Sequence, residues 1–489
     1  MHLDSDTKDT LLHQLSQIVT DEHLLTTKEA LTPYECDGLS AYQRLPVAVI
    51  LPDTIEQVQK IVQACSQLKV PIVARGAGTG LSGGALPHEG GIILGLSRFN
   101  KILSIDTDNL TAVVQPGVRN LAITEAARPH GLYYAPDPSS QIACTIGGNV
   151  AENSGGVHCL KYGLTVHNVL GVKFLTVDGD LIELGGKALD DAGYDLLALM
   201  HGSEGLLGVM VEVTVKLLPT PEMAKVCMAV FDDIEKAGQA VCDIISEGIV
   251  PAGLEMMDHL AIKAAEAYVK VGYPTDAQAI VLCEIDGTEH GVIDFIEKVE
   301  IVLKNAGAVD TRVSKDEAQR LQFWAGRKAA FPAVGRLAPD YYCMDGTIPK
   351  SRLAEVLKQI SVWSDEFGLP VANVFHAGDG NMHPLILYDA NKAGELEQTE
   401  VFGKKILELC VQVGGTITGE HGVGVEKLDS MCVQFAEGEL RQFHGIKDAF
   451  DAEGLLNPGK AVPTLHRCAE LGRMHVHNGK LPHPELERF

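Results

Sequence analysis

Long apolar runs, closely spaced cysteine pairs and basic residues are all scarce in this sequence. No run of about 18 or more apolar residues is present, so no segment is predicted to span a bilayer. The first residues, MHLDSDTKDTLLHQL, are acidic where a signal peptide would be basic and then apolar. We therefore expect a cytoplasmic protein that has no transmembrane segment of its own.

The 11 cysteines are scattered between Cys36 and Cys468, and none forms a C-x-x-C pair. This spacing argues against a zinc ribbon, a redox dithiol or an iron–sulfur cluster, and predicts reduced thiols that pack as small apolar side chains. The 65 acidic residues outnumber the 40 basic ones, which gives a net charge near −25. Because phosphate contacts need clustered Lys and Arg, we expect no nucleic-acid partner.

The chain does contain short apolar strands that alternate with helical patterns, which predicts an α+β protein. Its 489 residues are too many for one ordinary core. The segment PTPEM, with two prolines in three residues, is typical of a linker between two domains. The predicted units are a helical N-terminal segment (1–44), a first domain (45–220), a smaller second domain with a ferredoxin-like β-α-β unit (221–430), and a C-terminal helical segment and tail that return to the first domain (431–489).

A first glycine-rich loop, VARGAGTGLSGGA, has Gly78, Gly80 and Gly83 at G-x-G-x-x-G spacing. A Rossmann loop opens directly into a helix, whereas this one is followed by Pro87 and the strand GIILGL. Successive N–H groups of such a strand-to-strand loop can surround an anion such as a pyrophosphate. Arg75 at its edge would supply a counter-charge.

A second loop, PDPSSQIACTIGGNVAENSGG, has the same character. Thr145, Gly147, Gly148 and Asn149 precede or begin a short helix whose N-terminus favours phosphate. Two anion-binding loops in one domain indicate a dinucleotide cofactor.

These loops, together with GSEGLLGV, FWAGRKAAFPAVGRLAPDYYCMDGTIPK, HAGDGNMHP, TGEHGVG and LNPGK, resemble a known family. The sequence is similar to FAD-binding proteins of the vanillyl-alcohol oxidase (PCMH) type, and most of all to the FAD-linked subunits of bacterial glycolate oxidases, or glycolate dehydrogenases. The resemblance implies a two-subdomain FAD-binding domain followed by an α+β substrate (cap) domain. It also implies noncovalent FAD, because no histidine lies between Arg75 and Gly84.

The resemblance implies that the two loops and a few later residues hold the FAD. The expected cofactor-binding residues are Arg75, Gly76, Ala77, Gly78, Thr79, Gly80, Leu81, Ser82, Gly83, Gly84, Pro138, Ser139, Thr145, Gly148, Asn149, Asn153, Gly156, Val209 and Asn457.

The segment VFHAGDGNMHPLIL predicts a hairpin with an Asp379-Gly380 turn, in which His376 and His383 face each other. Two imidazoles on one face of a strand pair can bind one ion. Glu420, in the apolar segment GGTITGEHGVG that we expect to be a strand, would be the third ligand of an open site for Zn, Fe or Mn. The alternative is a set of hydrogen-bonded core residues. Family members use these positions as metal ligands, in agreement with the first interpretation.

Oxidation of a 2-hydroxy acid needs a cation for the carboxylate, a base for the hydroxyl proton and a hydride acceptor. Arg327 is the predicted carboxylate clamp, with Arg336 and Tyr342 as second choices. His421 is the predicted general base, and hydride would pass to flavin N5. The alternative is that His421 only makes a hydrogen bond to one of the metal ligands.

In the family that the sequence resembles, this subunit works with an iron–sulfur subunit and a second FAD-domain-like subunit. The resemblance therefore implies peripheral association with the inner face of the cell membrane through those partners. It favours oxidation of glycolate, with D-lactate as a further substrate. The alternatives are a D-lactate or D-2-hydroxyglutarate dehydrogenase that acts alone, and a flavin-free scaffold subunit without catalysis.

Overall fold

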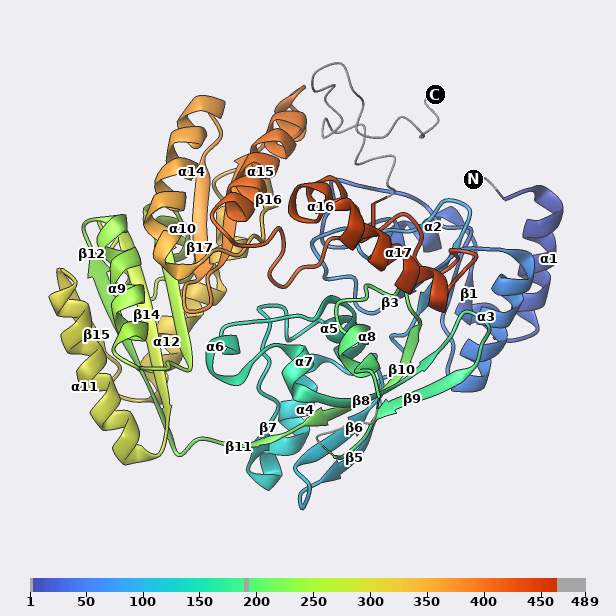
Figure 1. Ribbon diagram of the computed structural model, residues 1–489, viewed down its shortest axis with the longest axis horizontal. Helices are drawn as coiled ribbons and strands as arrows, with labels where there is room; N and C mark the ends of the chain where they lie inside the picture. The colour runs from blue at the N-terminus through green and yellow to red at the C-terminus, as the bar shows by residue number, and fades with distance from the viewer. Residues whose placement is uncertain (1–2, 189–192, 464–489) are drawn as a thin grey trace.

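The computed structural model describes residues 3–188 and 193–463 of the chain. Figure 1 shows two lobes, one formed by the first half of the chain and the other by a large sheet with helices on both sides. Near the described C-terminal end, the helix α17 lies against the first lobe, whereas α16 packs on α15 of the second lobe.

The first lobe contains two main sheets. One has the order β1-β2-β4-β3, in which β2, β4 and β3 are parallel. The other has the order β5-β6-β10-β8-β9 and is antiparallel. A short pair, β7 and β11, leads to the linker. The strands are β1 (Leu24–Leu25), β2 (Ala48–Ile50), β3 (Ile72–Arg75), β4 (Ile92–Gly95), β5 (Ile102–Asp106), β6 (Thr111–Val114), β7 (Leu132–Tyr133), β8 (Val169–Leu175), β9 (Leu181–Gly185), β10 (Val209–Lys216) and β11 (Leu218–Pro219).

The helices of this lobe are mostly short. Only α1 and α3 exceed ten residues, and the apolar face of α3 packs on the first sheet through residues such as Val58 and Ile61. The helices are α1 (Ser5–Ser16), α2 (Lys28–Leu31), α3 (Ile55–Leu68), α4 (Asn120–Ala127), α5 (Ile146–Glu152), α6 (Cys159–Tyr162), α7 (Thr165–Asn168) and α8 (Leu196–Met200).

The second lobe is built on one antiparallel sheet with the strand order β15-β12-β14-β13-β17-β18-β16. Its strands are rich in Val, Ile, Leu and Met, and are buried on both faces because helices cover both. The strands are β12 (Met223–Phe231), β13 (Gly253–Asp258), β14 (Ala279–Gly287), β15 (Asp310–Val313), β16 (Asp340–Cys343), β17 (Val371–His376) and β18 (Asn381–Tyr388).

Two groups of helices cover this sheet. One face packs against α9, α11, α14 and α15, and the other against α10, α12 and α13. The helices that follow the linker are α9 (Ile234–Ser246), α10 (His259–Val269), α11 (Glu289–Asn305), α12 (Glu317–Lys328), α13 (Ala330–Val334), α14 (Leu353–Phe367), α15 (Glu395–Gln412), α16 (Leu428–Gln434) and α17 (Glu437–Phe450).

The prediction of an α+β chain is confirmed, but the cap sheet is larger than the ferredoxin-like unit that the sequence indicated. The strand β13 and the helix α10 were missed. The segment GLEMMD carries two acidic residues, which disfavours a buried strand on propensity alone. In the structure both carboxylates have partners. Glu255 pairs with Arg327, and Asp258 accepts hydrogen bonds from the N–H groups of Asn373 and Ala261, each at 2.9 Å.

The two lobes also meet at His158, which lies just after the second glycine-rich loop. Its ring nitrogens lie 2.9 Å from Asp137 of the first lobe and 3.2 Å from Glu284 of the cap sheet. Burial alone would lower the pKa of His158, but the two carboxylates outweigh it and raise the pKa to about 10. A protonated His158 therefore joins the lobes.

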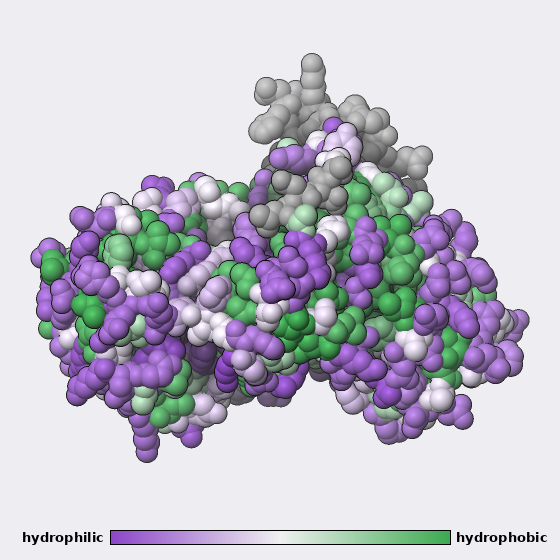
Figure 2. Space-filling model, turned by 90° about the horizontal axis from the view of Figure 1, so that it is seen from below, coloured by the Kyte–Doolittle hydropathy of each residue, from purple (hydrophilic) through white to green (hydrophobic). Residues whose placement is uncertain are grey.

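The surface agrees with the acidic composition. Figure 2 shows a face on which hydrophilic side chains predominate and apolar ones gather in separate areas. Among the described residues, no helix is long and apolar enough to cross a bilayer. Nine of the described cysteines are free thiols, as predicted.

Candidate functional site

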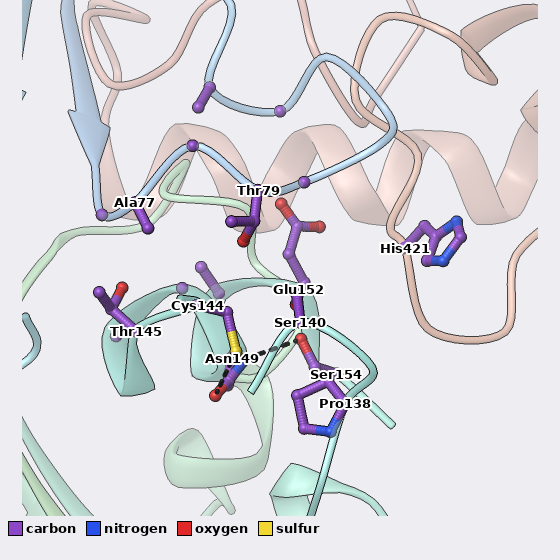
Figure 3. A pocket seen from close by; sticks show the side chains of 18 of the residues that line it. Ala77, Thr79, Pro138, Ser140, Cys144, Thr145, Asn149, Glu152, Ser154 and His421 are labelled. Atoms are coloured by element: carbon purple, nitrogen blue, oxygen red, sulfur yellow. Dashed lines mark hydrogen bonds between the residues drawn. The ribbon is translucent and has the colours of Figure 1, made fainter. Parts of the chain in front are cut away.

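A cavity of about 460 Å³ lies between the two lobes. Both glycine-rich loops line it from the first lobe, and His383, Glu420 and His421 line it from the cap. Figure 3 shows Thr79 of the first loop, Thr145 and Asn149 of the second, and His421 around the same space. The structure therefore brings the predicted cofactor loops and the predicted reactive side chains together.

The first glycine-rich loop presents free backbone donors. Within the described residues, no N–H from Gly76 to Gly84 donates a hydrogen bond to another part of the protein. Buried or half-buried backbone donors are normally paired. A loop of unpaired N–H groups on a cavity wall fits an anionic ligand such as the pyrophosphate of FAD.

Arg75 braces this loop from behind. Its Nη1 donates to the carbonyl oxygen of Cys36 at 2.7 Å, and its guanidinium lies 5.6 Å from the centroid of the Tyr34 ring. Gly78 has φ +70°, and a Cβ there would lie 2.2 Å from the Arg75 Nη2. Glycine is therefore needed both for the backbone conformation and for the arginine. Arg75 lines the cavity, so its predicted role as a counter-charge stays a prediction.

The described C-terminal segment closes over the same loop. Asn457 donates to the carbonyl oxygens of Gly84 at 3.0 Å and Glu204 at 2.6 Å. The ammonium of Lys460 donates to the carbonyl oxygen of Gly84 at 2.9 Å and to Asn457 Oδ1 at 2.6 Å. Burial lowers the pKa of Lys460 to about 7. This segment thus fixes the shape of the loop.

Most predicted cofactor-binding residues lie on the cavity wall. They are Arg75, Gly76, Ala77, Gly78, Thr79, Gly80, Leu81, Gly84, Pro138, Ser139, Thr145, Gly148 and Asn149. The cavity wall does not include Ser82, Gly83, Asn153, Gly156, Val209 and Asn457.

These six residues support the wall from outside the cavity. The carbonyl oxygen of Ser82 accepts from the N–H of Val425 at 3.0 Å, and a Cβ on Gly83 would meet the Val425 side chain. Asn153 ends α5 with φ 52° and accepts from the N–H of Val166 at 3.0 Å. A Cβ on Gly156 would lie 2.5 Å from the carbonyl oxygen of Asp137. Val209 is a buried residue of β10.

The predicted hairpin is present as β17 and β18, but its two histidines are diagonal neighbours. His376 pairs with Asn381 and His383 pairs with Val374, so the expectation that they face each other directly is wrong. Both side chains still point to one face of the sheet, because residues 381 and 383 share a face. Their ring centroids are 5.1 Å apart.

A carboxylate oxygen joins the two imidazoles. Glu420 Oε1 lies 3.2 Å from His376 Nε2 and 3.0 Å from His383 Nε2. These three ligand atoms lie within 4.8 Å of one another, and both histidines are buried. Two nitrogens and one oxygen that converge in this way fit a divalent cation with open positions. Cys343, His383 and His421 form a second group of the same size that shares His383.

Carboxylates flank His376 on both sides. Its Nδ1 lies 2.7 Å from Glu255 Oε1, on the neighbouring strand β13. Burial alone would lower the pKa of His376, but Glu255 and Glu420 outweigh it and raise the pKa well above its ordinary value. A carboxylate behind a histidine fixes the orientation of the ring and strengthens it as a ligand.

Arg327 contacts Glu255 on the side away from His376. It does not lie on the cavity wall. Its side chain is 1% exposed, its Nε donates to Glu255 Oε2 at 2.7 Å, and its Nη2 lies 2.7 Å from the same oxygen without hydrogen-bond geometry. Within the described residues its Nη1 makes no hydrogen bond. Arg327 thus balances the charge of Glu255, and its predicted contact with a substrate stays a prediction.

The segment that carries Glu420 and His421 is a loop, so the prediction that it is a strand is wrong. The carboxylate of Asp345 accepts from the N–H groups of Gly419 at 3.0 Å and His421 at 2.9 Å, and from the Thr418 hydroxyl at 2.6 Å. Asp345 is fully buried. These hydrogen bonds take the place of a neighbouring strand and hold both reactive side chains against the hairpin.

His421 stacks on His383, with ring centroids 4.9 Å apart and an interplanar angle of 13°. Burial lowers the pKa of His421 to about 4, in spite of the nearby Asp345. The imidazole is therefore neutral near pH 7 and can accept a proton. Its Nε2 lies 3.9 Å from Glu420 Oε1, and its Nδ1 has no hydrogen-bond partner in the described chain.

The second-choice clamp residues lie elsewhere. Arg336 donates to the carbonyl oxygen of Ala267 at 3.0 Å and lies over the Tyr268 ring. Tyr342 is a buried residue of β16, paired with Ile386 of β18. By contrast, the exposed Lys328 lines the cavity, together with Phe331 and Pro332.

Sequence reasoning missed Glu255, Asp345 and Glu152 as site residues. Glu152 lines the cavity, and the other two hold its reactive side chains. Asp345 stands in CMDGT, which the resemblance covered without singling out the aspartate. An acidic residue inside an otherwise apolar strand, as in GLEMMD, is the one local signal that could have pointed to Glu255.

Comparisons with known proteins agree with this site. Residues 46–185 match the family model described as "FAD binding domain", and residues 220–461 match that described as "FAD linked oxidases, C-terminal domain". The glycolate oxidase subunit GlcD of Escherichia coli (strain K12) is 62% identical over 98% of this chain and 96% of its own length. A D-lactate dehydrogenase of Anaerostipes hadrus is 32% identical over 90% of this chain and 95% of its own length.

The fold has solved counterparts as well. A structure of p-cresol methylhydroxylase with substrate bound matches with a TM-score of 0.78 and 17% identity, over 95% of this chain and 98% of that one. This likeness confirms the predicted PCMH-type architecture. The two family models and the relationship to the Escherichia coli subunit show that the chain belongs to the family of FAD-linked oxidases that contains the glycolate oxidase subunits.

Proposed function

We propose that the chain is the catalytic subunit of a glycolate oxidase, or glycolate dehydrogenase, which oxidises glycolate and also D-lactate to the 2-oxo acid. The observation that carries this proposal is the shared cavity, in which the free N–H groups of the first glycine-rich loop and the cluster of His383, Glu420 and His421 face one space. A bound FAD would supply the hydride acceptor, and a divalent cation held by His376, His383 and Glu420 would supply Lewis acidity toward the substrate hydroxyl.

His421 is the proposed general base. Its neutral imidazole can take the hydroxyl proton at Nε2, which faces Glu420 across 3.9 Å. Asp345 holds the backbone of this residue, and the stacked ring of His383 fixes its plane. Both lobes line the cavity, so a bound FAD would displace water from the place where the proton is transferred.

The substrate carboxylate needs a positive charge, and two neighbouring residues offer one. The free Nη1 of Arg327 is the proposed contact, since Nε and Nη2 of the same guanidinium already face Glu255. Lys328 lies on the cavity wall and is exposed. An exposed lysine is hydrated and mobile, so we propose that it attracts the substrate without fixing it.

Substitution of the two cations separates their roles. Arg327→Lys keeps the charge but loses the fork of donors, and should raise the KM for glycolate about 10- to 100-fold, the effect expected for a lost charged hydrogen bond. Lys328→Met should raise the KM less than about threefold. Steady-state kinetics on FAD-loaded variants check this. A larger effect from Lys328→Met than from Arg327→Lys would assign the clamp to Lys328.

The cavity favours short substrates. Phe331 packs edge-on against His383, with ring centroids 6.1 Å apart, and lines the cavity with Pro332. Arg336 is engaged elsewhere, so Lys328 is the cation that the cap offers to a distal carboxylate on the described cavity wall. D-2-hydroxyglutarate would thus place its second carboxylate against an aromatic ring.

Anaerobic mixing of the purified, FAD-loaded chain with each substrate tests the proposed function. We expect flavin bleaching with glycolate and D-lactate, and a kcat/KM for D-2-hydroxyglutarate at least tenfold lower, because an unpaired buried carboxylate is disfavoured. The similarity to a D-lactate dehydrogenase keeps D-lactate as the rival main substrate. A colourless protein that takes up no FAD would support the scaffold alternative.

We further propose that the electrons leave through partner proteins. The relative from Escherichia coli is named a subunit. An iron–sulfur subunit and a second FAD-domain-like subunit, at the inner face of the cell membrane, would receive the electrons and bring this cytoplasmic chain to the membrane.

A further inference from the structure

The side chain of Glu152 ends in the cavity. Glu152 is the last residue of α5 and lines the cavity between the two glycine-rich loops. Figure 3 shows its side chain pointing toward Thr79 of the first loop, on the side of the cavity where His421 lies. Its Oε2 is buried, and neither carboxyl oxygen makes a hydrogen bond with a described residue.

Glycines on two separate segments make room for this carboxyl group. A Cβ on Gly84 would lie 2.7 Å from Glu152 Oε1, and a Cβ on Gly422 would lie 2.0 Å from Oε2. Gly422 directly follows His421 in the chain. The carboxyl group therefore stands between the cofactor loop and the proposed base, where the reactive ring of a flavin has to lie if His421 and the ring are to act on one substrate.

The charged neighbours of Glu152 do not neutralise it. Asp37 and Glu204 are acids, and Glu204 accepts the N–H groups of Val423 and Gly424 at 2.7 Å each. The two cations are engaged: Lys427 lies 2.6 Å from Glu426, and Lys460 donates to the carbonyl oxygen of Gly84 at 2.9 Å. Burial raises the pKa of Glu152 well above its ordinary value, and the Glu204 carboxylate raises it further.

We propose that Glu152 is a neutral carboxylic acid that donates a hydrogen bond to an oxygen or ring nitrogen of the bound isoalloxazine. A protonated carboxyl group carries one O–H donor, and a buried donor without an acceptor is costly. No described residue accepts it, and the carboxyl group lines the cavity, where a bound ligand can supply the acceptor. This inference rests on the proposed function in one respect, namely that the flavin ring lies beside His421.

Two variants of similar size test the donor. Glu152→Gln keeps a neutral donor, whereas Glu152→Met keeps the length of the side chain and removes the donor. For each apo-protein, FAD affinity is measured by quenching of flavin fluorescence, and the absorption spectrum of the oxidised flavin is recorded. We expect the Kd of Glu152→Gln to lie within about twofold of the wild-type value and that of Glu152→Met to be about tenfold higher, with a shifted spectrum only for Glu152→Met.

The controls separate this inference from the proposed function. Glu125→Gln, at an exposed position of α4, should change neither the Kd nor the spectrum. Equal loss of FAD affinity in Glu152→Gln and Glu152→Met, or tighter FAD binding by Glu152→Gln than by wild type, would show that Glu152 acts as a charge and would overturn the proposal. An unchanged Kd and an unchanged spectrum for Glu152→Met would overturn the proposal as well.

If Glu152→Met fails to fold, as shown by the melting of the apo-protein, Glu152→Ala takes its place with the same expected results. Failure of the wild-type apo-protein to bind FAD would contradict the proposed function itself, which is a different outcome from any of these.

Discussion

Replacement of His421 by asparagine should slow the reduction of the bound flavin by glycolate about 10²- to 10⁴-fold, the range expected when a general base is removed. Asparagine retains a polar side chain at this position but cannot accept the hydroxyl proton near pH 7. Anaerobic stopped-flow mixing measures the rate constant for flavin bleaching directly. Because substrate binding depends on other groups, the substrate concentration at half-maximal rate should change far less than the rate constant.

The matched control is a His-to-Asn substitution at an exposed histidine. His130 is exposed and does not line the cavity, so His130→Asn should reduce its flavin at the wild-type rate. FAD and metal content are determined for both variants, since His421 follows Glu420 in the chain and a displaced loop would affect both ligands. If His421→Asn kept its FAD and metal and bleached as fast as wild type, His421 would not be the base.

The hairpin of the site could be predicted from the sequence because its signals are local. An Asp-Gly turn between two apolar runs predicts the reversal, and the separation of two residues between positions 381 and 383 decides which side chains share a face. The register of the two strands could not be read from the local sequence. His376 pairs with Asn381, which makes the two histidines diagonal neighbours, and only the observed turn shows this.

The loop that carries Glu420 and His421 could not be predicted, because a distant side chain shapes it. The segment GGTITGEHG has the β-branched residues of a strand, and Thr416 does form an isolated bridge with Thr347. Beyond it, the carboxylate of Asp345 takes the N–H groups that a neighbouring strand would have taken. No sequence pattern near position 420 indicates that a buried aspartate 75 residues earlier binds this segment.

The same reason explains why the partner of Arg327 could not be predicted. The motif FWAGRK predicted an arginine that binds the substrate, whereas the structure buries Arg327 outside the cavity wall, where it pairs with Glu255 of β13. Since β13 was missed, its carboxylate could not be considered as a partner. A buried arginine is paired as a rule, so an arginine assigned to a substrate from sequence alone always competes with an unseen acid.

The last expected result concerns the metal. The purified chain should contain about one divalent cation, and prolonged dialysis against a chelator should remove it and lower the rate of flavin reduction at least tenfold. Readdition of Zn²⁺, Fe²⁺ or Mn²⁺ to separate samples should restore the rate and identify the ion. Metal content is measured by mass spectrometry and the rate by anaerobic mixing with glycolate.

A graded set of carboxylate-to-amide substitutions tests the geometry of the site. Glu420→Gln removes the one oxygen that both imidazoles share, so it should abolish stoichiometric metal content. Glu255→Gln changes only the partner of His376 Nδ1 and should weaken metal affinity about 10- to 100-fold. Glu397→Gln, on the exposed side of α15, should leave it unchanged.

The order of these effects is more informative than any single loss. If His376, His383 and Glu420 hold a cation, the loss of metal affinity should be largest for Glu420→Gln, smaller for Glu255→Gln and absent for Glu397→Gln. The reason is that the substituted side chain lies farther from the ion in each successive variant. A purely hydrogen-bonded cluster gives a different result: metal content near zero in wild type, and flavin reduction that a chelator does not slow. In that case the pairing of His376 with two carboxylates would orient the hairpin, and His421 would have to act without a Lewis acid beside it.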